Sequence, residues 1–174
     1  MSLGVLAAVA LVAFVALSFY DGVVVHLWRE RLHTRPAARL EHRLHTARAA
    51  LFPLLLVVYF AGQGPLWLAA GLLLVDQCVE IADMAVERRS RAHSGGLPSM
   101  EYVVHGLLIT LRSAAVVLTW AAIHVGAQTD LLRTLAWVLL PGAVLAAVVH
   151  GVLIRWPCLG SRACRASASA GGVA

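Results

Sequence analysis

Residues 1–20, MSLGVLAAVALVAFVALSFY, contain no charged side chain, and the first charge of the chain is Asp21. An apolar run of about 20 residues is what a helix needs to cross the hydrocarbon core of a bilayer. The rest of the chain agrees, because 60% of its 174 residues are hydrophobic and only 13% are charged. A soluble domain carries about 25% charged residues. The composition therefore excludes a soluble domain and predicts an integral membrane protein.

Working outward from this run, five segments have the length and apolar character of membrane-spanning helices. They cover approximately residues 3–28, 41–63, 65–87, 101–124 and 132–154. The glycines and proline of 61–65 predict a tight turn between the second and third. We therefore expect an all-α, polytopic membrane protein with five transmembrane helices. Residues 1–154 would form a single transmembrane domain, and residues 155–174 a flexible cytoplasmic tail.

The arginines predict the orientation of the chain in the membrane. The chain has no lysine, and all arginines except Arg112 and Arg133 lie at one set of span ends or in the tail. The positive-inside rule makes that side cytoplasmic, with the N-terminus outside and the C-terminus inside. A lysine-free composition rich in alanine and arginine favours the bacterial inner membrane. No basic patch interleaved with aromatic residues indicates nucleic acid, so the lipid bilayer is the expected partner.

Four carboxylates in the predicted third span share one narrow face of a helix. They are Asp76, Glu80, Asp83 and Glu87. A carboxylate inside a membrane is costly unless it faces the bundle interior and finds a partner there. In the fourth span, Arg112 lies seven residues deeper than His105, and Asp76 lies deeper than Asp83 by the same number. We therefore predict a buried ion pair between Asp76 and Arg112, with Glu80 beside it.

Acids and histidines recur near the cytoplasmic ends of the spans. Glu41 and His45 are spaced i, i+4, and Glu101 and His105 have the same spacing, so each pair shares a helix face. In the first span, however, an acid and a histidine are five residues apart.

These two residues, Asp21 and His26, would lie about 140° apart around a regular α-helix. They can point at one spot only if the helix is locally distorted. The alternative is that His26 shares a face with Glu30 and His33, if the helix continues that far.

A shift of 60 residues aligns two parts of the chain. Arg29, Arg31, His33, Glu41 and His45 fall on Arg89, Arg91, His93, Glu101 and His105. This self-similarity predicts an internal repeat of residues 21–62 and 83–124. Spans one to four would then form a four-helix bundle from two duplicated hairpins, with the fifth span outside the repeat.

Such a bundle would gather carboxylates and imidazoles around one axis near the cytoplasmic interface. The candidate metal ligands are Asp21, His26, Glu41, His45, Asp83, Glu87, Glu101 and His105. Mixed oxygen and imidazole ligands suit iron, manganese or zinc. The set is similar in composition to the centre of four-helix di-iron proteins, although its spacing is i, i+4 instead of i, i+3. We expect a dinuclear site, with iron favoured over zinc or manganese because carboxylates are abundant.

The expected function is oxidation of a lipid-like or other hydrophobic substrate, with the redox partner unknown. Four arginines beside the site are candidates for holding an anionic head group. They are Arg29, Arg31, Arg89 and Arg91.

Three other functions fit the same residues. The first is a proton or metal-ion transporter that uses the carboxylate stripe of the third span. The second is a b-type cytochrome, with His26 and His105 as axial ligands. The third is a non-catalytic membrane scaffold, in which polar residues only hold the helices together.

Overall fold

The computed structural model describes residues 2–90 and 99–156, except for the side chains of 88–90. This part of the chain is helical apart from short connecting turns. The long helices are α1 (Leu3–Phe19), α2 (Arg39–Leu55), α3 (Leu66–Ser90), α4 (Ser99–His124) and α5 (Asp130–Arg155). Two π-helical segments continue α1 and α2, namely η1 (Tyr20–Arg29) and η4 (Leu56–Phe60). Two short 3₁₀ turns, η2 (Leu32–Thr34) and η3 (Pro36–Ala38), precede α2. The all-α prediction is confirmed.

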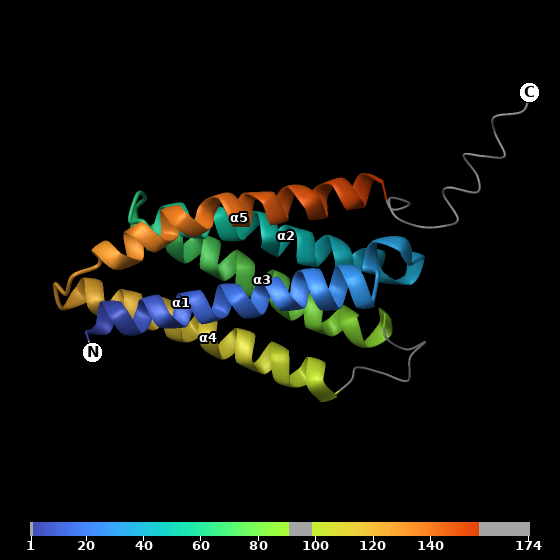
Figure 1. Ribbon diagram of the computed structural model, residues 1–174, viewed down its shortest axis with the longest axis horizontal. Helices are drawn as coiled ribbons and strands as arrows, with labels where there is room; N and C mark the ends of the chain where they lie inside the picture. Colours follow the sequence, from blue (N-terminus) through green and yellow to red (C-terminus); the bar gives the residue numbers. More distant parts are fainter. Residues whose placement is uncertain (1, 91–98, 157–174) are drawn as a thin grey trace, which may run out of the picture.

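Among the described residues, four helices are long and apolar enough to cross a membrane. They are Leu3–Arg29, Pro36–Phe60, Ser99–His124 and Asp130–Arg155. Helix α3 has 25 residues and runs beside the others (Figure 1), but it carries the acidic stripe and is not among these four. The predicted tail, 155–174, lies outside the described residues from position 157 onward.

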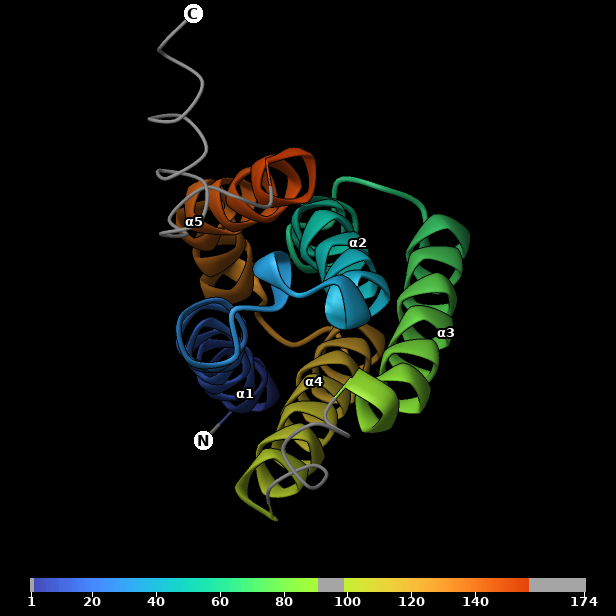
Figure 2. The same cartoon turned by 90° about the vertical axis from the view of Figure 1, so that its right-hand side faces the viewer.

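The helices pack in an order that differs from their order in the chain. Helix α1 packs chiefly against α4, whereas α2 packs against both α3 and α5. Viewed from one end, α1, α4, α3, α2 and α5 follow one another around the bundle (Figure 2). Each helix of the first predicted hairpin thus has a main neighbour in the second, and α5 is a further neighbour of α2.

The end of the bundle that holds the N-terminus has an apolar core. Ala7 and Leu11 of α1, Ala115 of α4 and Leu132 of α5 are buried there together. Alanine lets helices approach closely. This matters in a membrane, because the hydrophobic effect does not drive helices together there and close packing has to do so. Across this core, the Tyr59 hydroxyl donates a hydrogen bond of 2.8 Å to the backbone carbonyl of Val116.

The opposite end is irregular, because α1 continues into the π-helical segment η1. In a π-helix the hydrogen bond spans five residues, so positions i and i+5 lie on the same face. Asp21 and His26 have this separation, and both are almost fully buried. The local distortion that the sequence analysis required is therefore present. π-helical segments are rare in proteins, and those that occur are frequently found at functional sites.

The alternative for the first span, that His26 shares a helical face with Glu30 and His33, is wrong. The helix ends at Arg29, and Arg31 then adopts a left-handed conformation with φ of 48°. His33 consequently lies in the separate turn η2.

Candidate metal centre

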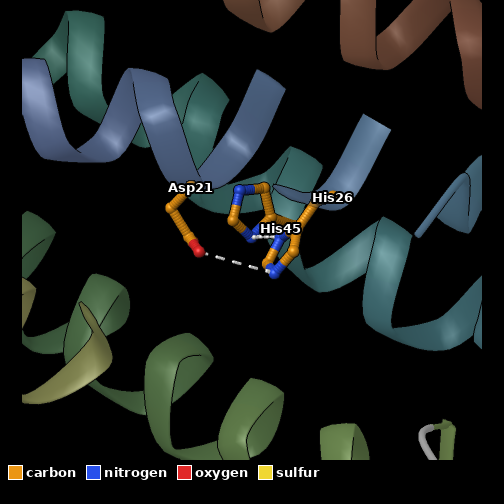
Figure 3. A group of neighbouring side chains, drawn as sticks. All are labelled: Asp21, His26 and His45. Atoms are coloured by element: carbon orange, nitrogen blue, oxygen red, sulfur yellow. Dashed lines mark hydrogen bonds and ion pairs between the residues drawn. The ribbon is translucent and has the colours of Figure 1, made fainter. Parts of the chain in front are cut away.

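Three ligand side chains from two helices meet at the end of the bundle that we call the histidine end, where His26, His45 and His105 lie. Asp21 and His26 come from η1 and His45 from α2 (Figure 3). His26 Nε2 lies 3.8 Å from Asp21 Oδ1, and the Nδ1 atoms of His26 and His45 lie 3.2 Å apart. We call this set the Asp21 group.

A second set of three, the Glu87 group, shares His26 with the first. Its other members are Glu87 of α3 and His105 of α4. His105 Nδ1 lies 3.3 Å from Glu87 Oε2, and His105 Nε2 lies 3.7 Å from Asp21 Oδ2. Four of the structural segments, η1, α2, α3 and α4, therefore contribute to one site.

The spacing of these atoms fits metal coordination. In each group, one ligand atom from every residue lies within 4.8 Å of the others. Two ligands about 2.1 Å from a metal, at bond angles of about 90–110°, are about 3.0–3.4 Å apart. The 3.3 Å between His105 Nδ1 and Glu87 Oε2 falls in this range. His26 faces His45 with Nδ1 and Asp21 with Nε2, and a single ion can bind only one of these nitrogens. Binding an ion would therefore require the side chains to move together from separations of up to 4.8 Å. Asp83 lies next to the Asp21 group, with Oδ2 3.6 Å from His45 Nδ1.

The burial of Asp21 would be costly if the cluster held no cation. Asp21 is only 2% exposed, and its Oδ1 atom accepts no hydrogen bond from the described residues. A buried carboxylate oxygen without a hydrogen bond costs free energy unless a positive charge is near it. A bound cation would supply that charge.

Besides Asp83, two of the predicted ligands, Glu41 and Glu101, belong to neither group within the described residues. Both are buried, at 1% and 4% exposure. The i, i+4 spacing placed each acid on the same helix face as its histidine, but one helical turn away along the axis. Only His45 and His105 of these two pairs lie in the groups.

Two histidines that the sequence analysis did not propose as ligands extend the cluster. His42 lies with its ring centroid 5.4 Å from that of His150 of α5, and His150 lies 5.4 Å from His45. Beyond them, the ring centroid of His33 lies 6.3 Å from that of His42. The spacing of His42 and His45, i and i+3, was a signal for the first. Nothing in the spacing of α5 indicated the second.

Gly22 lets the imidazoles approach η1. A Cβ atom at this position would lie 3.2 Å from His45 Nε2 and 3.7 Å from His150 Nε2. A longer side chain would occupy the space of the His45 ring itself.

We therefore expect Gly22→Leu to displace His45 and to lower the metal content of the purified protein by about tenfold or more. Elemental analysis of the purified protein measures this. Gly71→Leu is the matched control, because a Cβ atom at Gly71 meets nothing within 4 Å. Equal metal content in the two variants would contradict the placement of His45 in the centre.

Deeper in the bundle, two arginines and two carboxylates form a separate network. Arg112 of α4 contacts both Asp76 and Glu80 of α3. Arg48 of α2 donates a hydrogen bond of 2.7 Å to Glu80, and its Nε lies 3.6 Å from Asp76 Oδ1. Gln77 Oε1 accepts from Arg112 as well. The two positive and two negative charges of this arginine network balance. Arg48 was not part of the predicted ion pair.

The arginines proposed for head-group binding can be placed only in part. Arg29 and Arg31 are exposed at the histidine end. The side chain of Arg89 and all of Arg91 lie outside the described residues.

The chain matches no protein-family model, no curated protein and no solved structure. The residues and their geometry alone therefore carry the functional argument.

Proposed function

We propose that the protein is a membrane metalloprotein that holds a dinuclear centre at the histidine end. The observation that carries the proposal is the meeting of two three-ligand groups that share His26, buried among four segments. Each group offers one site for an ion. Each group combines one carboxylate with two imidazoles, which suits iron, manganese or zinc, and two histidines with one carboxylate is the ligand set of non-haem Fe(II) sites.

The reaction that this centre supports best is oxidation of a hydrophobic substrate by dioxygen. Insertion of one oxygen atom into a C–H bond converts R–H, O₂, two electrons and two protons into R–OH and water. An external electron donor must supply the two electrons. The centre would bind and activate dioxygen, and the histidines around it would exchange protons with the reacting oxygen.

The finer topology belongs to the same proposal. Helix α3 would cross the membrane as a fifth span despite its carboxylates, because these face the bundle interior and are paired there. The histidine end would be cytoplasmic in a bacterial inner membrane, as the arginine distribution favours. Helices α1 to α4 would descend from two duplicated hairpins, in which only the first copy developed the η1 distortion.

The alternatives have less support from the contacts. In a transporter, the stripe on α3 would conduct ions, yet Asp76 and Glu80 are both held by arginines. In a b-type cytochrome, a porphyrin would lie between His26 and His105. The 6.2 Å between their ring centroids would suit two axial ligands. However, Asp21 lies within 3.8 Å of both rings and Glu87 lies 3.3 Å from His105, so these carboxylates are where a porphyrin would have to fit. A scaffold would not require the π-helical segment that brings Asp21 to His26.

The test is elemental analysis of protein purified in detergent without chelators, followed by Mössbauer spectroscopy of ⁵⁷Fe-grown material. We expect one ion for each of the two groups, with iron predominating and the two ions magnetically coupled. Protein that folds and stays free of metal after anaerobic incubation with Fe²⁺ would contradict the proposal. Bound zinc in place of iron would retain the centre and replace oxidation by hydrolysis.

A further inference from the structure

A cavity of about 760 Å³ lies beside the metal centre, between α1, α2, α4 and α5. Along α5 it extends from Val138 to His150, which corresponds to about 18 Å of helix rise. Phe14 and Phe52 line its middle, and their rings contact each other edge to face at 5.5 Å. Volumes of about 300–1,000 Å³ are typical of small-molecule sites. The cavity is therefore large enough for a ligand and extends along α5.

Exposed residues of α1 and α5 line the cavity, which indicates an opening between these two helices. Three of its lining residues are largely exposed: Phe19 at 63%, Val138 at 67% and Leu145 at 64%. All three are apolar and lie on helices that are apolar enough to cross a membrane. The surroundings of the opening would be lipid chains, so a ligand would enter from the bilayer.

The charge of the cavity wall indicates the charge of the ligand. Arg48, Asp76 and Arg112 line the cavity, but they belong to the arginine network, whose charges balance. An anionic head group would have to compete with two carboxylates for the guanidinium groups. Asp21, the other charged lining residue, is itself a carboxylate, and the apolar part of the wall gives no compensation to a charged head. The wall therefore favours a neutral ligand.

The polar end of the cavity offers hydrogen bonds. Asp21, His45 and His150 line it there. His150 is 3% exposed, and its Nδ1 atom has no hydrogen-bond partner among the described residues. Buried polar atoms normally have a partner. A hydroxyl or carbonyl group would supply one.

We propose that this cavity binds a neutral amphiphile with a long apolar chain, whose hydroxyl or carbonyl head lies beside His45 and His150. The proposal deepens the proposed function and rests on it, because it places the head of the substrate next to the Asp21 group. Binding itself depends on the cavity and does not require the metal.

Photolabelling tests this in phosphatidylcholine nanodiscs, with the full chain and a hexadecanol that carries a diazirine in its chain. Gly142 lines the cavity, and a Cβ atom there meets nothing within 4 Å, so Gly142→Phe fills the space without a backbone clash. Ala146→Phe is a second filling variant at a lining position. Gly71→Phe on α3 is the matched control, since it is equally open and does not line the cavity.

We expect the labelled peptides of the wild-type protein to map to cavity-lining positions of α1 and α5. In both filling variants the labelling at these positions should fall about tenfold, because the phenyl ring occupies the volume that the hexadecyl chain would take. The control should keep it, and the permanently anionic hexadecyl sulfate analogue should label weakly. Equal labelling of filled and control variants, preference for the sulfate, or labels spread over all lipid-facing positions would overturn the proposal.

Metal analysis of the same samples separates the two proposals. Labelling that persists in metal-free protein supports the cavity even if the metal centre fails. If the Gly142→Phe variant keeps its metal and loses its labelling, the result supports both the metal centre and the cavity.

Discussion

His26→Ala should reduce the bound metal to less than about a tenth of the wild-type content, because each ligand group would keep only two of its three ligands. His26 is the one residue that both groups share. His105→Ala, in contrast, removes a ligand from the Glu87 group alone. It should leave about half of the metal, held by the Asp21 group. Elemental analysis and Mössbauer spectra of the three proteins measure the difference.

His124→Ala is the control for these variants. His124 lies exposed at the other end of α4, stacked on Trp120 with ring centroids 5.2 Å apart. Its loss should leave the metal content unchanged. If His26→Ala and His105→Ala lowered the metal content equally, the centre would hold a single ion bridging both groups. If neither changed it, the histidines would not be ligands.

Arg112→Leu should lower the free energy of unfolding by about 3–5 kcal/mol, the typical cost of breaking a buried ion pair by removing one partner. Arg112 contacts Asp76, Glu80 and Gln77. Its removal would leave two buried carboxylates with only Arg48. Unfolding of the purified protein by SDS titration, followed by far-UV circular dichroism, measures the change.

A double variant tests whether charge balance is the cause. Arg112→Leu combined with Glu80→Gln leaves one arginine and one carboxylate, so it should recover a large part of the lost stability. Arg133→Leu removes an exposed arginine from α5 and should have little effect. A double variant less stable than Arg112→Leu alone would mean that packing, and not charge, makes Arg112 important.

The arginine network illustrates what helical periodicity can predict. Spacing of i, i+4 puts Asp76 and Glu80 on one face of α3, and the rise per residue gives their depth. Equal depth was sufficient to nominate Arg112 as their partner, and the structure places the three in contact. Arg48 is seven residues after Glu41 and therefore shares its helix face, but its partners on α3 depended on how α2 and α3 pack.

The candidate metal centre depended more strongly on packing. In a regular α-helix Asp21 and His26 would lie about 140° apart. The π-helical segment brings both side chains to the same face. π-helical segments are rare, and the contacts of His26 with His45 of α2 and of Asp21 with His105 of α4 are tertiary, so the local sequence does not predict this segment. His150 joined the cluster because α5 packs against α2.

The sequence by itself determined that the chain is helical, that its helices are apolar enough for a membrane, and that the carboxylates of α3 share one face. These properties follow from composition and from the period of the α-helix, which are local. Only the tertiary structure decided which helices are neighbours, where the helix changes its pitch, and which imidazoles face Asp21. In lipid all apolar helix faces are chemically alike, so close packing and buried polar contacts between helices select the neighbours.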